Sequence, residues 1–250
     1  GYSALEKINP GVIMVSISPF GQTGPYKDYK APDIVAWATG GVEYVVGDAD
    51  RPPVRISHHS QAHLHAAASG AVGALAALYY REMAGYGQQV DVSIQECITR
   101  CSFMFTSAWD MMKINLQRGG LTAGIRMTRT WPCKDGYVMW FIWSGPQAKR
   151  FNTPFIEWMA EEGIADDVVK GFDWDEFDLR TEPQELIDRF EALAGRFFLK
   201  HTKAELMQGA FKHRVMLFPI STSKDILESA QLAAREFWVQ LEHPELGTSI

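Results

Sequence analysis

The sequence contains little cysteine and no cluster of basic residues. Cys97, Cys101 and Cys133 show no CxxC spacing, so they favour neither a disulfide framework nor a zinc knuckle and fit a reducing cytoplasm. The net charge of -6 gives no reason to expect a nucleic-acid partner. The apolar stretches, such as residues 66–80, are too short and too rich in small residues to span a bilayer. We therefore expect a cytoplasmic protein without nucleic-acid or membrane partners.

The composition that remains is that of an ordinary folded protein. Of the 250 residues, 46% are hydrophobic and 22% are charged, which is sufficient for a sizeable core. A change of composition follows Gly119 and Gly120, where a basic stretch gives way to amphipathic helices with acidic loops. We therefore predict two domains, residues 1–125 and 126–250.

The first half alternates helical and strand patterns. Apolar and β-branched residues dominate residues 11–18, as in a strand buried on both faces of a parallel sheet, and glycine and proline punctuate the loop at 19–25. The other expected elements are helices at 2–8, 32–46 with a break at Gly40 and Gly41, an alanine-rich helix at 60–83, a strand at 90–94 and a helix at 95–116. This order predicts an α/β fold. In the second half, residues 131–142 suggest a turn followed by a strand.

Four short motifs occur in a specific order. They are NP at 9–10 with the strand and FGQTGPY at 20–26, the alanine-rich helix with GYGQQVDVS at 85–93, WPCKDG at 131–136, and EHPELG at 242–247. Together they resemble the family III CoA-transferases, a group that includes formyl-CoA and carnitine CoA-transferases and the α-methylacyl-CoA racemases. The resemblance covers nearly the whole chain.

The resemblance implies a fold, a substrate class and an assembly. The expected fold is part of a Rossmann-like CoA-binding large domain at 1–125, followed by a smaller α+β domain at 126–250. The chain would be a fragment that lacks the N-terminal and C-terminal parts of the family. The expected substrates are a coenzyme A thioester and a carboxylic acid, without a further cofactor. The expected assembly is an interlocked homodimer, or a heteromer with a paralogue.

The family's nucleophile is an aspartate near the start of the alanine-rich helix, and counting back from Gly73 places that position at His63. No Asp or Glu occurs between Asp50 and Glu82, so no small shift of alignment restores a carboxylate. Exchange of CoA between acids passes through an anhydride, which an imidazole cannot form. Three readings stay open for His63: a direct catalytic role, a vestige in a non-catalytic subunit, and a hydrogen-bonded histidine of a pocket or core.

Other candidate residues follow from the same resemblance. Asp33 corresponds to an acidic position that faces the catalytic carboxylate, and its alternative role is a helix cap or first-turn acid. Phe20, Gly21 and Gln22 are expected to form part of the CoA site, with a simple tight turn as the alternative. Lys30 corresponds to a lysine that reaches a CoA phosphate, or is a solvated surface lysine.

Several further patterns have both a functional and a purely structural interpretation. Gly119 and Gly120 resemble, loosely, a glycine-rich loop that closes over the intermediate, with an interdomain linker as the alternative. The histidines near the alanine-rich helix favour the lining of a pocket over a metal site, because no Cys or carboxylate lies among them; they are His58, His59, His63 and His65. The aromatic residues at 103–109 and 140–143 are expected in the core rather than in an acyl pocket.

Three functions are compatible with these residues. The first is a CoA-transferase that moves CoA between an acyl-CoA and a carboxylic acid. The second is a non-catalytic partner subunit of a heteromeric CoA-transferase, because His63 replaces the aspartate. The third is a racemase, whose pattern requires a His at position 32 and an Asp at position 63, where this sequence has Pro32 and His63.

Overall fold

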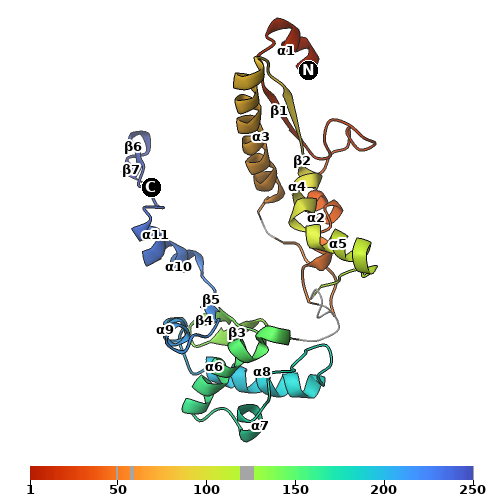
Figure 1. Ribbon diagram of the computed structural model, residues 1–250. Helices are drawn as coiled ribbons and strands as arrows, with labels where there is room; N and C mark the ends of the chain where they lie inside the picture. The colour runs from red at the N-terminus through yellow and green to blue at the C-terminus, as the bar shows by residue number, and fades with distance from the viewer. Residues whose placement is uncertain (49, 57–58, 119–126, 250) are drawn as a thin grey trace. The chain divides into compact units, whose positions relative to one another are not determined.

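The computed structural model describes residues 1–48, 50–56, 59–118 and 127–249 (Figure 1). The chain divides into two compact units, Gly1–Arg126 and Met127–Ile250. The predicted boundary at residue 125 lies beside this division. Gly119 and Gly120 lie outside the described residues.

Unit 1, residues 1–126, is a parallel strand pair with helices between and after the strands. Its helices and strands are α1 (Tyr2–Ile8), β1 (Met14–Ser18), α2 (Asp33–Thr39), the 3-10 turn η1 (Glu43–Val45), α3 (Ala62–Ala84), β2 (Gln89–Ser93), α4 (Ile94–Cys101) and α5 (Phe103–Met112). β1 and β2 pair in register from Met14 opposite Gln89 to Ser18 opposite Ser93. Parallel neighbours need a long crossover, which α2 and α3 provide. The predicted α/β class is confirmed.

The small residues of α3 allow it to lie close against the strand pair. A Cβ atom at Gly73 would be 2.6 Å from Cγ1 of Val90, and one at Gly70 would be 3.0 Å from Cδ1 of Ile17. The helix therefore packs backbone against side chain at these points, as its alanine-rich sequence predicts. Within the described residues, no helix combines the length and the apolar composition that a membrane span requires.

The burial of β1 differs from the expectation for a strand covered on both faces. Residues 14–16 are half-buried and Ile17 is 46% exposed. Among the described residues β1 pairs with β2 alone and packs on α3, so only part of its surface is covered. The strand also begins at Met14 rather than at residue 11.

The single helix predicted at 95–116 is two helices, because the chain bends at Ser102. The buried Ser102 hydroxyl donates to the backbone carbonyls of Gly40 (3.3 Å) and Thr99 (2.9 Å), which competes with regular helix bonding. The bend leaves Phe103 and Trp109 exposed. The prediction that the aromatic residues at 103–109 belong to the core is wrong for these two.

Unit 2, residues 127–250, is an antiparallel sheet with helices around it. Its elements are β3 (Thr130–Cys133), β4 (Gly136–Met139), η2 (Gly145–Gln147), α6 (Ala148–Glu161), α7 (Asp167–Lys170), α8 (Gln184–Phe198), α9 (Lys203–His213), β5 (Phe218–Pro219), α10 (Ser223–Leu227), α11 (Ala230–Ala234), β6 (Glu242–His243), η3 (Pro244–Leu246) and β7 (Thr248–Ser249). The three-stranded sheet has the order β3-β4-β5, and β6 pairs with β7.

An aromatic cluster forms the core of unit 2. The Trp140 and Phe155 rings lie 4.4 Å apart, and Phe198 stacks on Phe155 at 5.4 Å. Asn152 is buried and bonds in both directions with the backbone of Trp143, so its polar atoms are satisfied. The expectation that Trp140 is a core residue is confirmed.

Residues 131–133 are the first strand of a hairpin rather than the turn that the sequence suggested. Trp131 lies opposite Val138, and Cys133 lies opposite Gly136. The turn therefore contains only Lys134 and Asp135. The Trp131 indole N–H donates to the carbonyl of Trp140 at 2.8 Å, which ties the first strand to the residue that follows the second.

Candidate functional site

His63 is the second residue of α3, and it occupies the position at which the family resemblance predicts the nucleophile. α3 begins at Ala62 after Gln61, whose side chain does not cap the helix. The His63 side chain is 51% exposed. The imidazole is therefore accessible to small molecules. This accessibility is required if His63 lines a pocket or takes part in catalysis, but not if it is a core histidine.

Asp33 is the first residue of α2, and its carboxylate caps the neighbouring helix α3. Oδ1 accepts a hydrogen bond of 2.7 Å from the backbone N–H of Ala62. The first N–H groups of a helix have no partner inside the helix, and a negative charge there is favourable. Asp33 is only 5% exposed. Asp33 is thus a first-turn acid of α2, which is one of the alternatives expected for it, and in addition it caps α3, which the sequence did not predict.

Asp33 and His63 face each other across the start of α3. Oδ1 of Asp33 lies 3.7 Å from Nδ1 of His63, which is an ion-pair distance when the imidazole is protonated. The other oxygen, Oδ2, is buried and has no hydrogen-bond partner among the described residues. A buried carboxylate oxygen without a donor is costly, so this site has capacity for one more hydrogen bond. The structure thus brings these two predicted residues together.

His65 has different surroundings from His63, although it is only two residues later on α3. Its Nδ1 lies 3.8 Å from Sγ of Cys101, and its ring packs edge-on to Trp37 at 5.6 Å. In the part of the chain that the structure describes, no three His, Cys, Asp or Glu side chains could hold a metal ion together. His58 lies outside that part.

The loop after β1 is held by Asp91 in the middle of β2. Gly21 adopts φ +88°, a conformation that suits glycine, and the backbone N–H of Gln22 donates to Oδ2 of Asp91 at 2.9 Å. The Gln22 amide donates to Oγ of Ser18. Sequence reasoning did not select Asp91, because its contact with Gln22 depends on the parallel pairing of β1 and β2.

The aromatic ring of Phe20 packs against two tyrosines of its own loop. Its centroid lies 5.6 Å from that of Tyr26 and 6.5 Å from that of Tyr29, and the two tyrosines stack at 5.2 Å. Lys30, one residue after Tyr29, is exposed. The contacts of Phe20, Gly21 and Gln22 described above lead to their own loop and to the strand ends rather than to His63. A common cleft for these residues and His63 stays a prediction.

A groove of about 520 Å³ lies elsewhere in unit 1, between the end of α2 and the helices α4 and α5. Its volume is in the range of small-molecule sites. It is lined by Thr39, Gly40, Gly41, Tyr44, Val45, Thr99, Ser102, Phe105, Thr106, Trp109, Asn115 and Leu116. The sequence analysis did not expect this groove, because it assigned Phe105 and Trp109 to the core.

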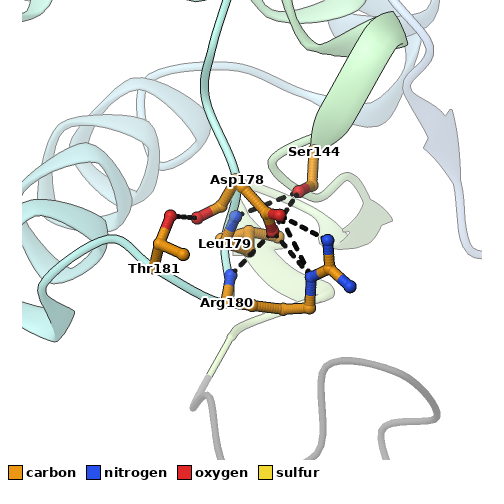
Figure 2. Close-up of polar contacts among 5 residues, drawn as sticks. All are labelled: Ser144, Asp178, Leu179, Arg180 and Thr181. Atoms are coloured by element: carbon orange, nitrogen blue, oxygen red, sulfur yellow. Dashed lines mark hydrogen bonds and ion pairs between the residues drawn. The ribbon is translucent and has the colours of Figure 1, made fainter.

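Unit 2 contains a polar cluster of its own around Asp178 (Figure 2). The Arg180 guanidinium donates to both carboxylate oxygens, the backbone N–H of Arg180 donates to Oδ1, and Ser144 Oγ approaches Oδ1 at 3.5 Å. The hydrogen bonds from Arg180 lower the pKa of Asp178 to about 2. Arg180 belongs to the same turn as Asp178, and Ser144 lies just before η2, so the cluster fixes the loop around Asp178 to that segment.

Comparison with known proteins decides the family. The model of the family described as CoA-transferase family III matches residues 1–250. The chain belongs to this family. The predicted resemblance is confirmed.

Two curated relatives illustrate the family III membership. The chain is 32% identical to the succinyl-CoA:(R)-benzylsuccinate CoA-transferase subunit BbsE of Thauera aromatica, over 100% of the chain and 60% of the relative. It is 30% identical to the succinyl-CoA–D-citramalate CoA-transferase of Chloroflexus aurantiacus, over 99% of the chain and 59% of the relative. The family III chain thus spans about three fifths of the length of these relatives.

A solved structure supports the family III fold. A CaiB/BaiF family protein from Brucella suis superposes with a TM-score of 0.78 at 23% identity, over 96% of this chain and 60% of that protein. This likeness concerns the fold. The roles predicted for His63, Asp33, Phe20, Gly21, Gln22 and Lys30 stay predictions.

Proposed function

We propose that this chain is part of a subunit of a heteromeric family III CoA-transferase, which moves CoA between an acyl-CoA and a carboxylic acid. In this proposal the subunit binds a CoA thioester, and an Asp-bearing paralogue supplies the nucleophilic carboxylate. The single observation that carries the proposal is the state of Asp33, the carboxylate that caps the start of α3. Asp33 is buried and already accepts a hydrogen bond from Ala62, so it is poorly placed to attack a thioester.

The chemistry of the exchange explains why this observation matters. A carboxylate attacks the thioester carbonyl to form a mixed anhydride and releases the CoA thiolate, which then attacks the enzyme side of the anhydride. An enzyme-bound CoA thioester results, and a second acid repeats the two steps in reverse. Imidazole can attack a thioester but yields an acyl-imidazole, which cannot continue by this route. His63 therefore does not replace an aspartate in this sequence of reactions.

The names of relatives support a heteromer. One relative is itself named a subunit, BbsE, and others are named the alpha and beta subunits of a succinyl-CoA–L-malate CoA-transferase. The expected assembly is an interlocked dimer, here with a paralogue, although a homodimer fits the family equally well. The three cysteines are free, which fits a reducing cytoplasm.

The CoA site proposed in this subunit contains the loop of Phe20, Gly21 and Gln22, with Lys30 at the phosphate groups. Support comes from the positive φ of Gly21, which allows backbone to approach a ligand closely, and from the exposure of Lys30.

A second candidate function, a self-sufficient transferase that uses His63, is favoured by the exposed imidazole alone. The racemase is disfavoured, because Pro32 and His63 occupy both positions of its pattern.

Reconstitution tests the proposal. The full-length protein is purified alone, the Asp-bearing paralogue is purified alone, and exchange of CoA between succinyl-CoA and a panel of acids is measured for each and for the mixture. We expect exchange in the mixture and none above background with this protein alone. Efficient exchange by this protein alone, without a paralogue, would contradict the assignment as a partner subunit.

A further inference from the structure

We propose that Asp33 and His63 form a general-base pair that hydrolyses the acyl-CoA bound by this subunit. The inference rests on the proposed binding of a CoA thioester, and it adds a reaction that the exchange does not include. In this pair His63 is the catalytic residue and Asp33 is a positioning residue.

The orientation of the imidazole is the first step of the argument. Nδ1 of His63 is turned toward Oδ1 of Asp33 at 3.7 Å, while the side chain as a whole is 51% exposed. A carboxylate accepts hydrogen bonds and does not donate them when ionised, so Asp33 favours the imidazole tautomer that carries its proton on Nδ1. Nε2 then carries the lone pair. This is the tautomer that a general base requires.

The state of the carboxylate is the second step. Asp33 is 5% exposed, Oδ1 holds the N–H of Ala62, and Oδ2 has no hydrogen-bond partner among the described residues. Nδ1 of His63 faces Oδ1 rather than Oδ2, and Oδ1 has a second lone pair beside the one that accepts from Ala62, so the imidazole is a donor close to this carboxylate. The present distance is longer than a hydrogen bond, as is common for catalytic pairs without substrate.

The neighbouring histidine does not compete for this role. His65 on the same helix has its Nδ1 beside Cys101 on α4 and its ring edge-on to Trp37 on α2. Asp33 thus pairs with His63 and not with His65. The position and the partner together distinguish His63 from His65.

The proposed reaction is hydrolysis, in which water accepts the acyl group of the thioester. Nε2 of His63 takes a proton from water while the water oxygen bonds to the thioester carbonyl carbon. The tetrahedral intermediate then collapses, the C–S bond breaks, and the sulfur leaves with the proton returned by the imidazolium. The products are a carboxylic acid and the free thiol of CoA. Because position 63 carries no carboxylate to accept the acyl group, water takes that place.

The experiment measures release of free CoA thiol from succinyl-CoA by the full-length protein, without an acceptor acid, together with the affinity for succinyl-CoA. We expect steady hydrolysis by the unmodified protein. His63→Gln should reduce it about 100-fold, the scale of a lost general base, with unchanged affinity. His63→Ala should lose as much but recover part of the rate when imidazole is added. His63→Gln, which fills the space, is the control for hydrolysis by imidazole in solution.

Asp33→Asn tests the positioning residue. The amide oxygen can still accept from Ala62, so the cap of α3 is retained, while the negative charge beside Nδ1 is lost. We expect kcat for hydrolysis to fall about tenfold or more with KM unchanged, which a merely structural role would not produce. If Asp33→Asn does not fold, the His63 variants carry the test, because His63 is exposed.

The outcomes separate this inference from the proposed function. If succinyl-CoA binds but its hydrolysis is absent, or is equal in His63→Gln, the base pair is overturned and the heteromer proposal stands. If succinyl-CoA does not bind at all, both are overturned. Hydrolysis that depends on His63, in a protein that performs no exchange alone, supports both.

Discussion

At the scale of single residues, the difference between aspartate and histidine at position 63 decides which chemistry is available. His63→Asp supplies an exposed carboxylate at the start of α3, next to Asp33. We expect the variant to form a covalent CoA thioester with succinyl-CoA, which hydroxylamine cleaves and mass spectrometry maps to position 63. His63→Asn, of similar shape but without a nucleophile, is the matched control and should stay unmodified. An adduct on His63→Asn, or none on His63→Asp, would argue against position 63 as the family's nucleophile position.

A second residue-scale prediction concerns acid stability. Hydrogen bonds from Arg180 lower the pKa of Asp178 from 3.8 to about 2. A depressed carboxylate pKa contributes stability above the unfolded value, and this contribution is lost as the pH falls through the folded value. The stability difference between the unmodified protein and Asp178→Asn should therefore be constant above about pH 5 and shrink as the pH falls toward 2. Urea denaturation at several pH values measures it.

The control for this prediction is Asp167→Asn. The Asp167 carboxylate is fully exposed and lies 3.9 Å from Lys170. The stability difference between the unmodified protein and Asp167→Asn should depend much less on pH, since exposed ion pairs contribute little to stability. Equal pH dependence in both variants would contradict the role given to Arg180.

The residues of the candidate site show what a sequence can and cannot predict. Asp33 and His63 were expected near each other from the family resemblance, and the structure places Oδ1 and Nδ1 3.7 Å apart. The cap on Ala62 was not predictable, because it joins residues 29 positions apart through a single backbone N–H. Asp91, which holds the loop at Gln22, was missed for the same reason: its role depends on the parallel pairing of β1 and β2.

At the scale of elements, the packing of α9 depends on a glycine. A Cβ atom at Gly209 would be 2.1 Å from Cζ2 of Trp158, whose ring is buried between His213 and Phe197 and cannot move aside easily. Gly209→Ala should therefore lower the free energy of unfolding by about 1–3 kcal/mol, although alanine favours helices. Chemical denaturation measures the change.

Gly195 in the last turn of α8 provides the control for Gly209. The nearest atom to its Cβ position is Cζ3 of Trp131 at 3.4 Å, an ordinary contact. Gly195→Ala should leave the stability unchanged or raise it by up to about 1 kcal/mol, the intrinsic preference of alanine in a helix. Equal destabilisation by the two substitutions would remove steric packing as the explanation.

The elements themselves were predictable where local patterns and packing agree. The alanine-rich helix was expected at 60–83 and is observed at Ala62–Ala84, ended by Gly85 in a left-handed conformation. The hairpin of β3 and β4 was half missed, since Pro132 disfavours a strand and only the pairing with Tyr137 reveals one. The bend at Ser102 depends on a hydroxyl bond to Gly40, a residue 62 positions earlier, which no local pattern contains.

At the scale of the whole molecule, each unit has its own core. The aromatic cluster of unit 2 involves residues of β3, α6 and α8, all within Met127–Ile250. We expect residues 127–250, expressed alone, to fold and to show a cooperative thermal transition by far-UV circular dichroism. The substitution Phe155→Ala, which removes a fully buried ring, should lower or abolish this transition. A gradual, non-cooperative melt of the unsubstituted unit would contradict its independence.

The change of composition after Gly120 predicts a domain boundary near residue 125, and the structure divides into two units after Arg126. The exposed apolar side chains of α3 were less predictable: Val72, Leu75 and Tyr79 are each more than 65% exposed. Alanine-rich patterns predict close packing on some surface but do not say which faces the packing covers. What a helix packs against is a property of the whole molecule rather than of its own sequence.

The distribution of the tryptophans between the two units determines which unit dominates the intrinsic fluorescence of the protein. Six of the eight tryptophans lie in unit 2, and only Trp37 and Trp109 lie in unit 1. Intrinsic fluorescence is therefore dominated by unit 2, whereas the 23-residue helix α3 gives unit 1 a large share of the helical signal. Fluorescence emission excited at 295 nm would then report mainly the unfolding of unit 2. It would change little when unit 1, which carries His63, unfolds. Replacing the exposed Trp109 would leave Trp37, which packs against His65, as the single tryptophan of unit 1.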